Sequence, residues 1–128
     1  MNLANSRILI VDDDPLMRQY VATVLSRIGV EHVRDCADGT AALKLVASFK
    51  PDLVLTDIHM EPMGGLEFVR LLREHAAIEL RKTRVIFMSA DSSRGTLEEA
   101  LPLGTFGYIV KPPRPETLRS KLEQALKV

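Results

Sequence analysis

Side chains suited to binding a metal ion and a phosphoryl group stand directly after four short apolar segments of this sequence. They are two adjacent carboxylates, a third carboxylate, a hydroxyl and an ammonium group: Asp12, Asp13, Asp57, Ser89 and Lys111. Three carboxylates at one place repel one another, so a positive group is needed beside them. A divalent cation with oxygen ligands, such as Mg²⁺, would supply that charge. With the lysine and the serine, it would make a site for a doubly negative oxyanion.

Asp57 is the best candidate for a nucleophile. It ends the buried apolar segment 53–56 and precedes a loop rich in glycine and proline. A carboxylate in such a place can accept a phosphoryl group and form an aspartyl phosphate. Each candidate alone also has a plainer interpretation, as a helix cap, a turn residue or a solvent-facing side chain. We expect Asp14 to be only a helix cap and not part of the site.

These side chains can meet only if the segments before them lie in one sheet. The apolar segments alternate with helical patterns, which is typical of a parallel sheet covered on both faces. The expected strands are 7–11, about 30–36, 53–57, 84–88 and 108–110; the expected helices are 15–28, one after Asp38, one from about 66, about 93–103, and one from 115. We therefore predict an α/β fold with a doubly wound, flavodoxin-like sheet of order 2-1-3-4-5 and helices on both faces.

That strand order determines where the candidate residues lie. Strands 7–11 and 53–57 become neighbours at the point where the strand order reverses, and ligands bind there at the carboxyl ends of the strands. Strand 30–36 mixes charged with apolar residues, which indicates an edge strand. The predicted sheet thus brings the carboxylates, Ser89 and Lys111 to one rim.

Composition narrows the function classes. The chain has 128 residues, with 17 Lys plus Arg balanced by 17 Asp plus Glu, so we expect one domain over 1–128 that binds no nucleic acid directly. No apolar run approaches the roughly 20 residues that span a membrane, and the first six residues lack a secretion signal. We therefore expect a cytoplasmic protein with no membrane partner. The single cysteine, Cys36, is expected to be a small buried filler rather than a reactive thiol.

Four motifs resemble those of CheY-like receiver domains, the phosphoacceptor domains of two-component response regulators. They are residues 8–13, Asp57 with Met60 and Gly65, Ser89-Ala90, and residues 107–112. The resemblance covers about 7–126, which we take as the core of a receiver domain. The sequence departs from the usual pattern at Glu61, where the family has Pro, and also at Gly64 and Thr105.

The resemblance implies roles for the acidic residues. Asp57 would be the phosphoacceptor, and Asp13 and Asp57 would bind Mg²⁺ directly, with Mn²⁺ as an alternative ion. Asp12 would act mainly through water, and the backbone carbonyl of His59 would be a further ligand.

The resemblance also implies roles at the other strand ends. Ser89 and Lys111 would contact the phosphoryl group, and the Lys111–Pro112 peptide would be cis. Ser89 and Tyr108 would be the switch residues. Tyr108 and Phe106 are two of only six aromatic residues, and we expect them to form a partner-binding patch.

The implied function is a phosphorylation-activated signalling switch rather than an enzyme. A sensor histidine kinase or a histidine phosphotransfer protein would donate a phosphoryl group from phosphohistidine to Asp57. The added charge of about −1.5 to −2 would then change a protein-binding face made of 93–103, 108–110 and the last helix. Such a chain acts by protein contact, unless it was cut from a longer protein.

Two other function classes share part of this pattern. A metal-dependent phosphohydrolase of the haloacid dehalogenase type would need a second Asp two residues after Asp57, where this chain has His59. A flavodoxin-like cofactor binder would need a phosphate-binding loop after the first strand, where residues 12–14 are acidic and would repel phosphate.

Overall fold

A single parallel sheet forms the centre of the molecule in the computed structural model, which describes residues 2–90 and 103–128. Its strands lie in the order β2-β1-β3-β4-β5, and all neighbouring strands are parallel. The strands are β1 Arg7–Val11, β2 His32–Cys36, β3 Leu53–Asp57, β4 Arg84–Ser89 and β5 Tyr108–Val110. The predicted fold class and strand order are confirmed.

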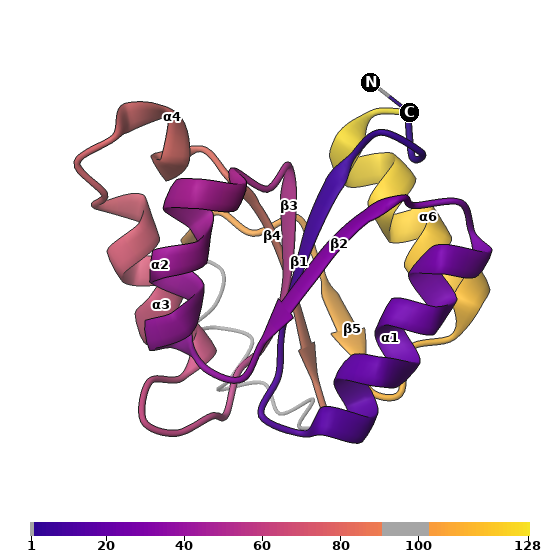
Figure 1. Cartoon of the computed structure of the whole chain (residues 1–128), viewed down its shortest axis with the longest axis horizontal. Coiled ribbons are helices and arrows are strands. Elements are labelled where there is room, and N and C mark those ends of the chain that lie inside the picture. The colour runs from indigo at the N-terminus through magenta and orange to yellow at the C-terminus, as the bar shows by residue number, and fades with distance from the viewer. Residues whose placement is uncertain (1, 91–102) are drawn as a thin grey trace.

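Helices cover both faces of the sheet (Figure 1). On one face lie α1 (Pro15–Arg27) and α6 (Pro115–Leu126), and on the other lie α2 (Gly39–Phe49) and α3 (Gly65–Arg73). A short helix, α4 (Ile78–Arg81), stands between α3 and β4, where the sequence predicts no helix. The helix expected over 93–103 falls almost wholly outside the described residues. No helix in the described ranges is long and apolar enough to span a membrane.

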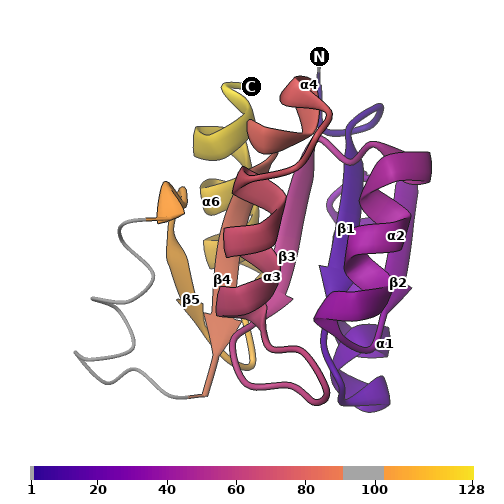
Figure 2. The same ribbon diagram turned by 90° about the vertical axis from the view of Figure 1, so that its left-hand side faces the viewer.

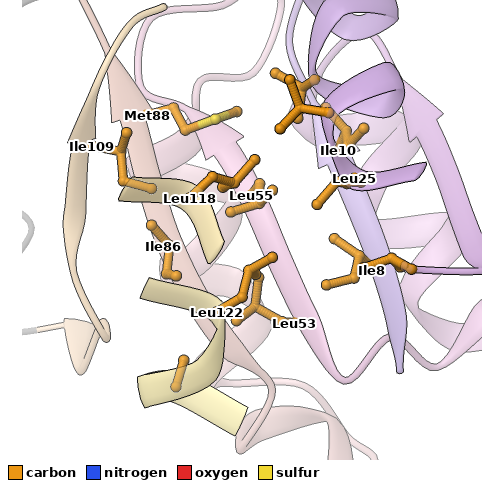
Figure 3. Close-up of a cluster of buried hydrophobic side chains, with 14 of the residues drawn as sticks. Ile8, Ile10, Leu25, Leu53, Leu55, Ile86, Met88, Ile109, Leu118 and Leu122 are labelled. Carbon is orange, nitrogen blue, oxygen red and sulfur yellow. The ribbon is translucent and has the colours of Figure 1, made fainter. Parts of the chain in front are cut away.

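Alternate residues of the central strands enter two separate cores, because successive side chains of a strand point to opposite faces. One core joins the sheet to α1 and α6 (Figure 3) and includes Ile8, Ile10, Leu25, Leu53, Leu55, Ile86, Met88, Leu118 and Leu122. The other joins it to α2 and α3 and includes Leu9, Val11, Val54, Phe68, Leu72, Val85 and Phe87. Burial on both faces explains why these strands read as continuous apolar runs. By contrast, β2 is partly exposed along its length, as expected for an edge strand.

Capping residues set where α1 and α2 begin and end. The Asp14 carboxylate accepts a hydrogen bond from Leu16 N at 3.0 Å, and Pro15 is the first residue of α1. Gly29, which follows α1, has φ +102, a conformation that favours glycine at a helix end. Asp38 caps α2 by accepting from Ala41 N at 3.0 Å. The predicted cap at Asp14 is confirmed, so α1 begins at Pro15, just after the acidic pair Asp12 and Asp13 and this cap.

The register of the strands places their carboxyl ends at one rim. Val11 pairs with Thr56, Asp57 with Met88, and Ser89 with Val110. In Figure 2 the arrowheads of β1, β3 and β4 all lie at the lower end of the sheet. The residues that follow these strands are therefore close neighbours, whatever their separation in sequence.

Candidate phosphoryl and metal site

Three carboxylates form an acidic cluster at this rim. Asp12, Asp13 and Asp57 each offer an oxygen within 4.8 Å of the others. Asp12 is fully buried and Asp57 is 6% exposed, whereas Asp13 is exposed. The sequence pattern placed all three at one site, and the structure brings them together. The acidic cluster is thus buried on the side of β1 and β3 and open on the side of Asp13.

The ammonium group of Lys111 joins two members of the acidic cluster. Its Nζ lies 2.8 Å from Asp12 Oδ2 and 2.9 Å from Asp57 Oδ2, and its side chain is only 12% exposed. Burial by itself would lower the pKa of Lys111, but hydrogen bonds and charge attraction from Asp12 and Asp57 outweigh it and raise that pKa. Lys111 is therefore a protonated counterion between β1 and β3, and not a solvent-facing lysine.

Asp57 is held by its own backbone neighbours as well as by Lys111. Its Oδ1 accepts a hydrogen bond from Ile58 N at 2.7 Å. The helix α3 begins close behind it, since Gly65 N donates to Ile58 O at 2.8 Å. A Cβ atom on Gly65 would collide with the carbonyl oxygen of Asp57. Only glycine allows the loop to return so closely to the end of β3.

The open side of the acidic cluster faces a shallow hollow of about 360 Å³. Its lining includes Asp13, His59, Glu61 and Gly64. The Glu61–Pro62 peptide in this loop is cis. The Lys111–Pro112 peptide is also cis, as the resemblance implied. This hollow leaves Asp13 and the loop after Asp57 open to solvent.

Ser89 and Tyr108 lie on the neighbouring strands. Ser89 is 1% exposed at the end of β4, and its carbonyl oxygen accepts a hydrogen bond from Lys111 N at 3.0 Å. Tyr108 is partly buried against the core beside α2 and α3. Its hydroxyl is buried and has no hydrogen-bond partner in the described part of the chain. Phe106 is 47% exposed. The backbone thus ties Ser89 to Lys111, while Tyr108 lies one strand further out.

Cys36 and Asp14 contact Asp12 only through their backbones, and their side chains serve other purposes. Burial raises the pKa of Cys36 to about 11, so its thiol stays protonated and poorly nucleophilic at neutral pH. It packs partly buried against the core beside α2 and α3, as expected for a filler. Asp14 serves as the cap of α1.

Arg18 is a contact of the site that the sequence reasoning missed. Its Nη1 donates a hydrogen bond to the carbonyl oxygen of Asp12 at 2.7 Å. One signal for it existed in the sequence. The helix dipole disfavours a cation near the start of a helix. An arginine only four residues after the cap Asp14 therefore indicates a specific contact that offsets this cost.

Comparison with known proteins connects this geometry to a family. Residues 8–123 match the family model described as the response regulator receiver domain. The chain is 36% identical over 120 residues to the chemotaxis protein CheY-3 of Vibrio cholerae, covering 94% of this chain and 91% of that protein. It is 37% identical over 126 residues to the regulatory protein AtoC of Escherichia coli, covering 98% of this chain but 26% of AtoC. The structure of the chemotaxis response regulator CheY4 of Vibrio cholerae superposes with a TM-score of 0.84 at 31% identity, covering 94% of this chain and 98% of that one.

Proposed function

This chain belongs to the family of response regulator receiver domains, and from that membership we propose that it is a phosphorylation-dependent switch whose phosphoacceptor is Asp57. One observation carries the proposal. A protonated lysine is held between the carboxylates of Asp12 and Asp57, while Asp13 stays open to solvent. This arrangement leaves a nucleophilic carboxylate, a cation and a metal-binding side chain around the same space. We propose the receiver core at 7–126 and a cytoplasmic location.

The acidic cluster has the chemistry of a Mg²⁺ site. Three carboxylates against one ammonium group leave an excess of two negative charges, and carboxylate oxygens are ligands that Mg²⁺ prefers. Asp13 and Asp57 would hold the ion directly, with the backbone carbonyl of His59 as a further ligand. Asp12, which is fully buried and paired with Lys111, would act mainly through water. Bound Mg²⁺, or Mn²⁺ in its place, would neutralise charge on the phosphoryl oxygens.

In the phosphotransfer step that we propose, this chain supplies the nucleophile and the groups that contact the phosphoryl oxygens. A carboxylate oxygen of Asp57 attacks the phosphorus of a phosphohistidine on a sensor kinase or a histidine phosphotransfer protein. The new O–P bond forms as the P–N bond breaks, and the electron pair leaves with the imidazole. Lys111 and Ser89 would each contact an oxygen of the transferred group. Chemistry of this kind supports a regulator with transient self-catalysed steps, and receiver domains are in general signalling regulators rather than enzymes.

Phosphorylation would change partner binding by replacing contacts that Lys111 and Ser89 make in the unphosphorylated protein. Lys111 would exchange an Asp57 oxygen for the phosphoryl group, and Ser89, joined to Lys111 through its carbonyl, would move with it. We propose that a downstream protein reads this change on the face made of 93–103, β5 and α6. Part of that face, 93–102, lies outside the described residues. The exposed side chains of Phe106 and Val110 support an interface there.

Phosphoryl transfer to Asp57 can be tested with a small-molecule phosphodonor. Incubation with acetyl phosphate and Mg²⁺ should add one phosphate, detected by intact-protein mass spectrometry, and Asp57→Asn should abolish the addition. An Asp57→Asn protein that gains the same label would overturn the proposal. Sustained hydrolysis of small phosphoesters by the wild type would instead favour the alternative, a phosphohydrolase with an Asp nucleophile.

A further inference from the structure

Every hydrogen-bonding group of Asp12 is already engaged. Its backbone N donates to Cys36 O at 3.1 Å, its Oδ1 accepts from Asp14 N at 2.9 Å, and its Oδ2 accepts from Lys111 at 2.8 Å. The remaining group, its carbonyl oxygen, accepts from Arg18 Nη1 at 2.7 Å. Three of these contacts come from the neighbouring strand, the adjacent turn and the site lysine. Only the contact to the carbonyl comes from a side chain that lies outside the proposed site.

The carbonyl of Asp12 belongs to the peptide plane that links Asp12 to Asp13. Because that peptide is planar, a hydrogen bond to its oxygen also fixes the orientation of Asp13 N and restrains where the Asp13 side chain begins. No hydrogen bond holds the exposed carboxylate of Asp13 in the described part of the chain. Its aim toward Asp57 therefore depends on the backbone, and Arg18 is a main restraint on that backbone.

Arg18 is itself oriented from the edge of the sheet. Its Nε lies 3.3 Å from Asp35 Oδ1 on β2, and its side chain is 21% exposed. The planar guanidinium can thus donate to the Asp12 carbonyl and form an ion pair with Asp35 at once, which a lysine ammonium on a flexible stem would do less well. The chain of contacts runs from Asp35 through Arg18 and Asp12 to Lys111 and Asp57.

We propose that Arg18 is a positioning residue for the metal site: it holds the Asp12–Asp13 peptide so that Asp13 faces Asp57, and Asp35 keeps it in place. This inference rests on the proposed function of the acidic cluster. Arg18 touches neither the phosphoryl group nor the metal, and acts through the backbone of Asp12. Outer-shell partners of this kind typically contribute 10- to 100-fold to metal affinity.

The test replaces Arg18 with methionine, which keeps an unbranched apolar stem and removes the guanidinium with its donors. Arg18 lines a surface hollow of about 590 Å³ beside α1 rather than either core, so the variant is expected to fold. Arg27→Met is the matched control, because Arg27 is an exposed arginine of the same helix that lines the same hollow. Mg²⁺ affinity is measured by isothermal titration calorimetry, and thermal unfolding is followed in EDTA.

Arg18→Met should bind Mg²⁺ about tenfold more weakly than the wild type, whereas Arg27→Met should match it. Arg18→Lys should recover part of the loss, and Asp35→Asn should cost no more than about fivefold because that ion pair is half exposed. A merely structural arginine would lower the unfolding midpoint in EDTA without changing the Mg²⁺ affinity of the folded protein, and that result would overturn the inference. Equal affinities for Arg18→Met and Arg27→Met would overturn it as well. A wild type that binds no Mg²⁺ would overturn the metal site and this inference together.

Discussion

The three carboxylates of the acidic cluster differ in how far their oxygens are already used. Asp12 accepts hydrogen bonds on both oxygens, and so does Asp57. Asp13 is exposed, and its carboxylate accepts no hydrogen bond from the described residues. At the scale of single residues, Asp13 is therefore the carboxylate most available to a metal ion, and Asp12 chiefly anchors Lys111.

Replacing Asp13 with alanine should separate metal binding from folding. We expect at least a tenfold loss of Mg²⁺ affinity, since even an outer-shell partner typically contributes that much. The free energy of unfolding without metal should stay the same or rise, because the change relieves repulsion from Asp12 and Asp57. Calorimetric titration and urea unfolding in EDTA measure the two effects. Glu79→Ala removes an exposed carboxylate elsewhere and serves as the control; unchanged Mg²⁺ affinity in Asp13→Ala would show that the metal site is misplaced.

Lys111 should stabilise the fold in a pH-dependent way. Its pKa is raised in the folded state by Asp12 and Asp57 against the opposing effect of burial. A group with a raised folded pKa stabilises fully below its unfolded pKa, about 10.4 for lysine, and loses that effect as the pH rises through the folded value. Lys111→Met should therefore lower the free energy of unfolding at pH 7 by about 3 kcal/mol, the low end for breaking a buried ion pair.

The same comparison at alkaline pH tests the sign. Urea unfolding of the wild type and of Lys111→Met should differ most near neutral pH, and the difference should shrink above about pH 10. Lys44→Met, which removes an exposed lysine on α2, should have little effect at either pH. A difference that grew in alkali would contradict a lysine held protonated by the two carboxylates.

At the scale of elements, Arg73 joins α3 to the segments that flank β4 and β5. Its guanidinium donates to the carbonyl oxygens of Arg81 at 2.9 Å and Thr83 at 2.6 Å, before β4. It also donates to those of Leu103 at 2.8 Å and Gly104 at 3.2 Å, before β5. One side chain thus pairs four carbonyl oxygens from two segments that are far apart in the sequence.

Arg73→Met should therefore destabilise the protein by about 2–3 kcal/mol, since it leaves buried carbonyls such as that of Thr83 unpaired. Arg70→Met is the matched control: Arg70 is exposed on the same helix, and its loss should change stability by less than about 0.5 kcal/mol. Urea unfolding measures both. Equal stabilities for the two variants would show that water replaces the donors of Arg73.

The helices and strands that could be predicted are those whose formation depends on residues within the same stretch of sequence. Strands β1 and β3 are continuous apolar runs because both of their faces are covered, and Asp14 with Pro15 marks the start of α1 through capping chemistry. The short helix α4 escaped prediction because four residues carry no periodic apolar stripe. The contacts of Arg73 could not be predicted for another reason. Its partners are backbone carbonyls, which carry no sequence signature, so an arginine that binds them looks like any exposed one.

At the scale of the whole molecule, the site lies where the order of the strands reverses. Chain topology alone places Asp12, Asp57 and Lys111 at one rim, which is why their types and positions in sequence predicted the acidic cluster. Topology does not say which oxygen accepts from which donor. The bridging position of Lys111 and the contact of Arg18 to a backbone carbonyl depend on side-chain conformations that only the packed structure determines.

Coupling between Asp57 and a partner-binding face should pass through Tyr108. This residue pairs with Phe87 on β4, two residues before Ser89, and its buried hydroxyl has no hydrogen-bond partner in the described residues. An unpaired buried hydroxyl costs free energy, so a conformation that pairs it would be favoured once the phosphoryl group draws Ser89 and Lys111 toward Asp57. Tyr108→Phe should thus be at least as stable as the wild type, yet should respond differently to phosphorylation.

Tyr108→Ala should leave phosphorylation of Asp57 intact and uncouple it from partner binding. Coupling of this kind is typically about 1–3 kcal/mol, or roughly 5- to 150-fold in affinity. A partner is first isolated with the phosphorylated wild type, and its affinity is then compared with and without phosphate for Tyr108→Ala and for Phe106→Ala. Phe106 is exposed and lies two residues before β5, so its loss should weaken binding in both states rather than alter the ratio. If Tyr108→Ala keeps the wild-type ratio and Phe106→Ala keeps the wild-type affinity, the output face lies elsewhere, and α1 with its exposed Leu16 is the next surface to test.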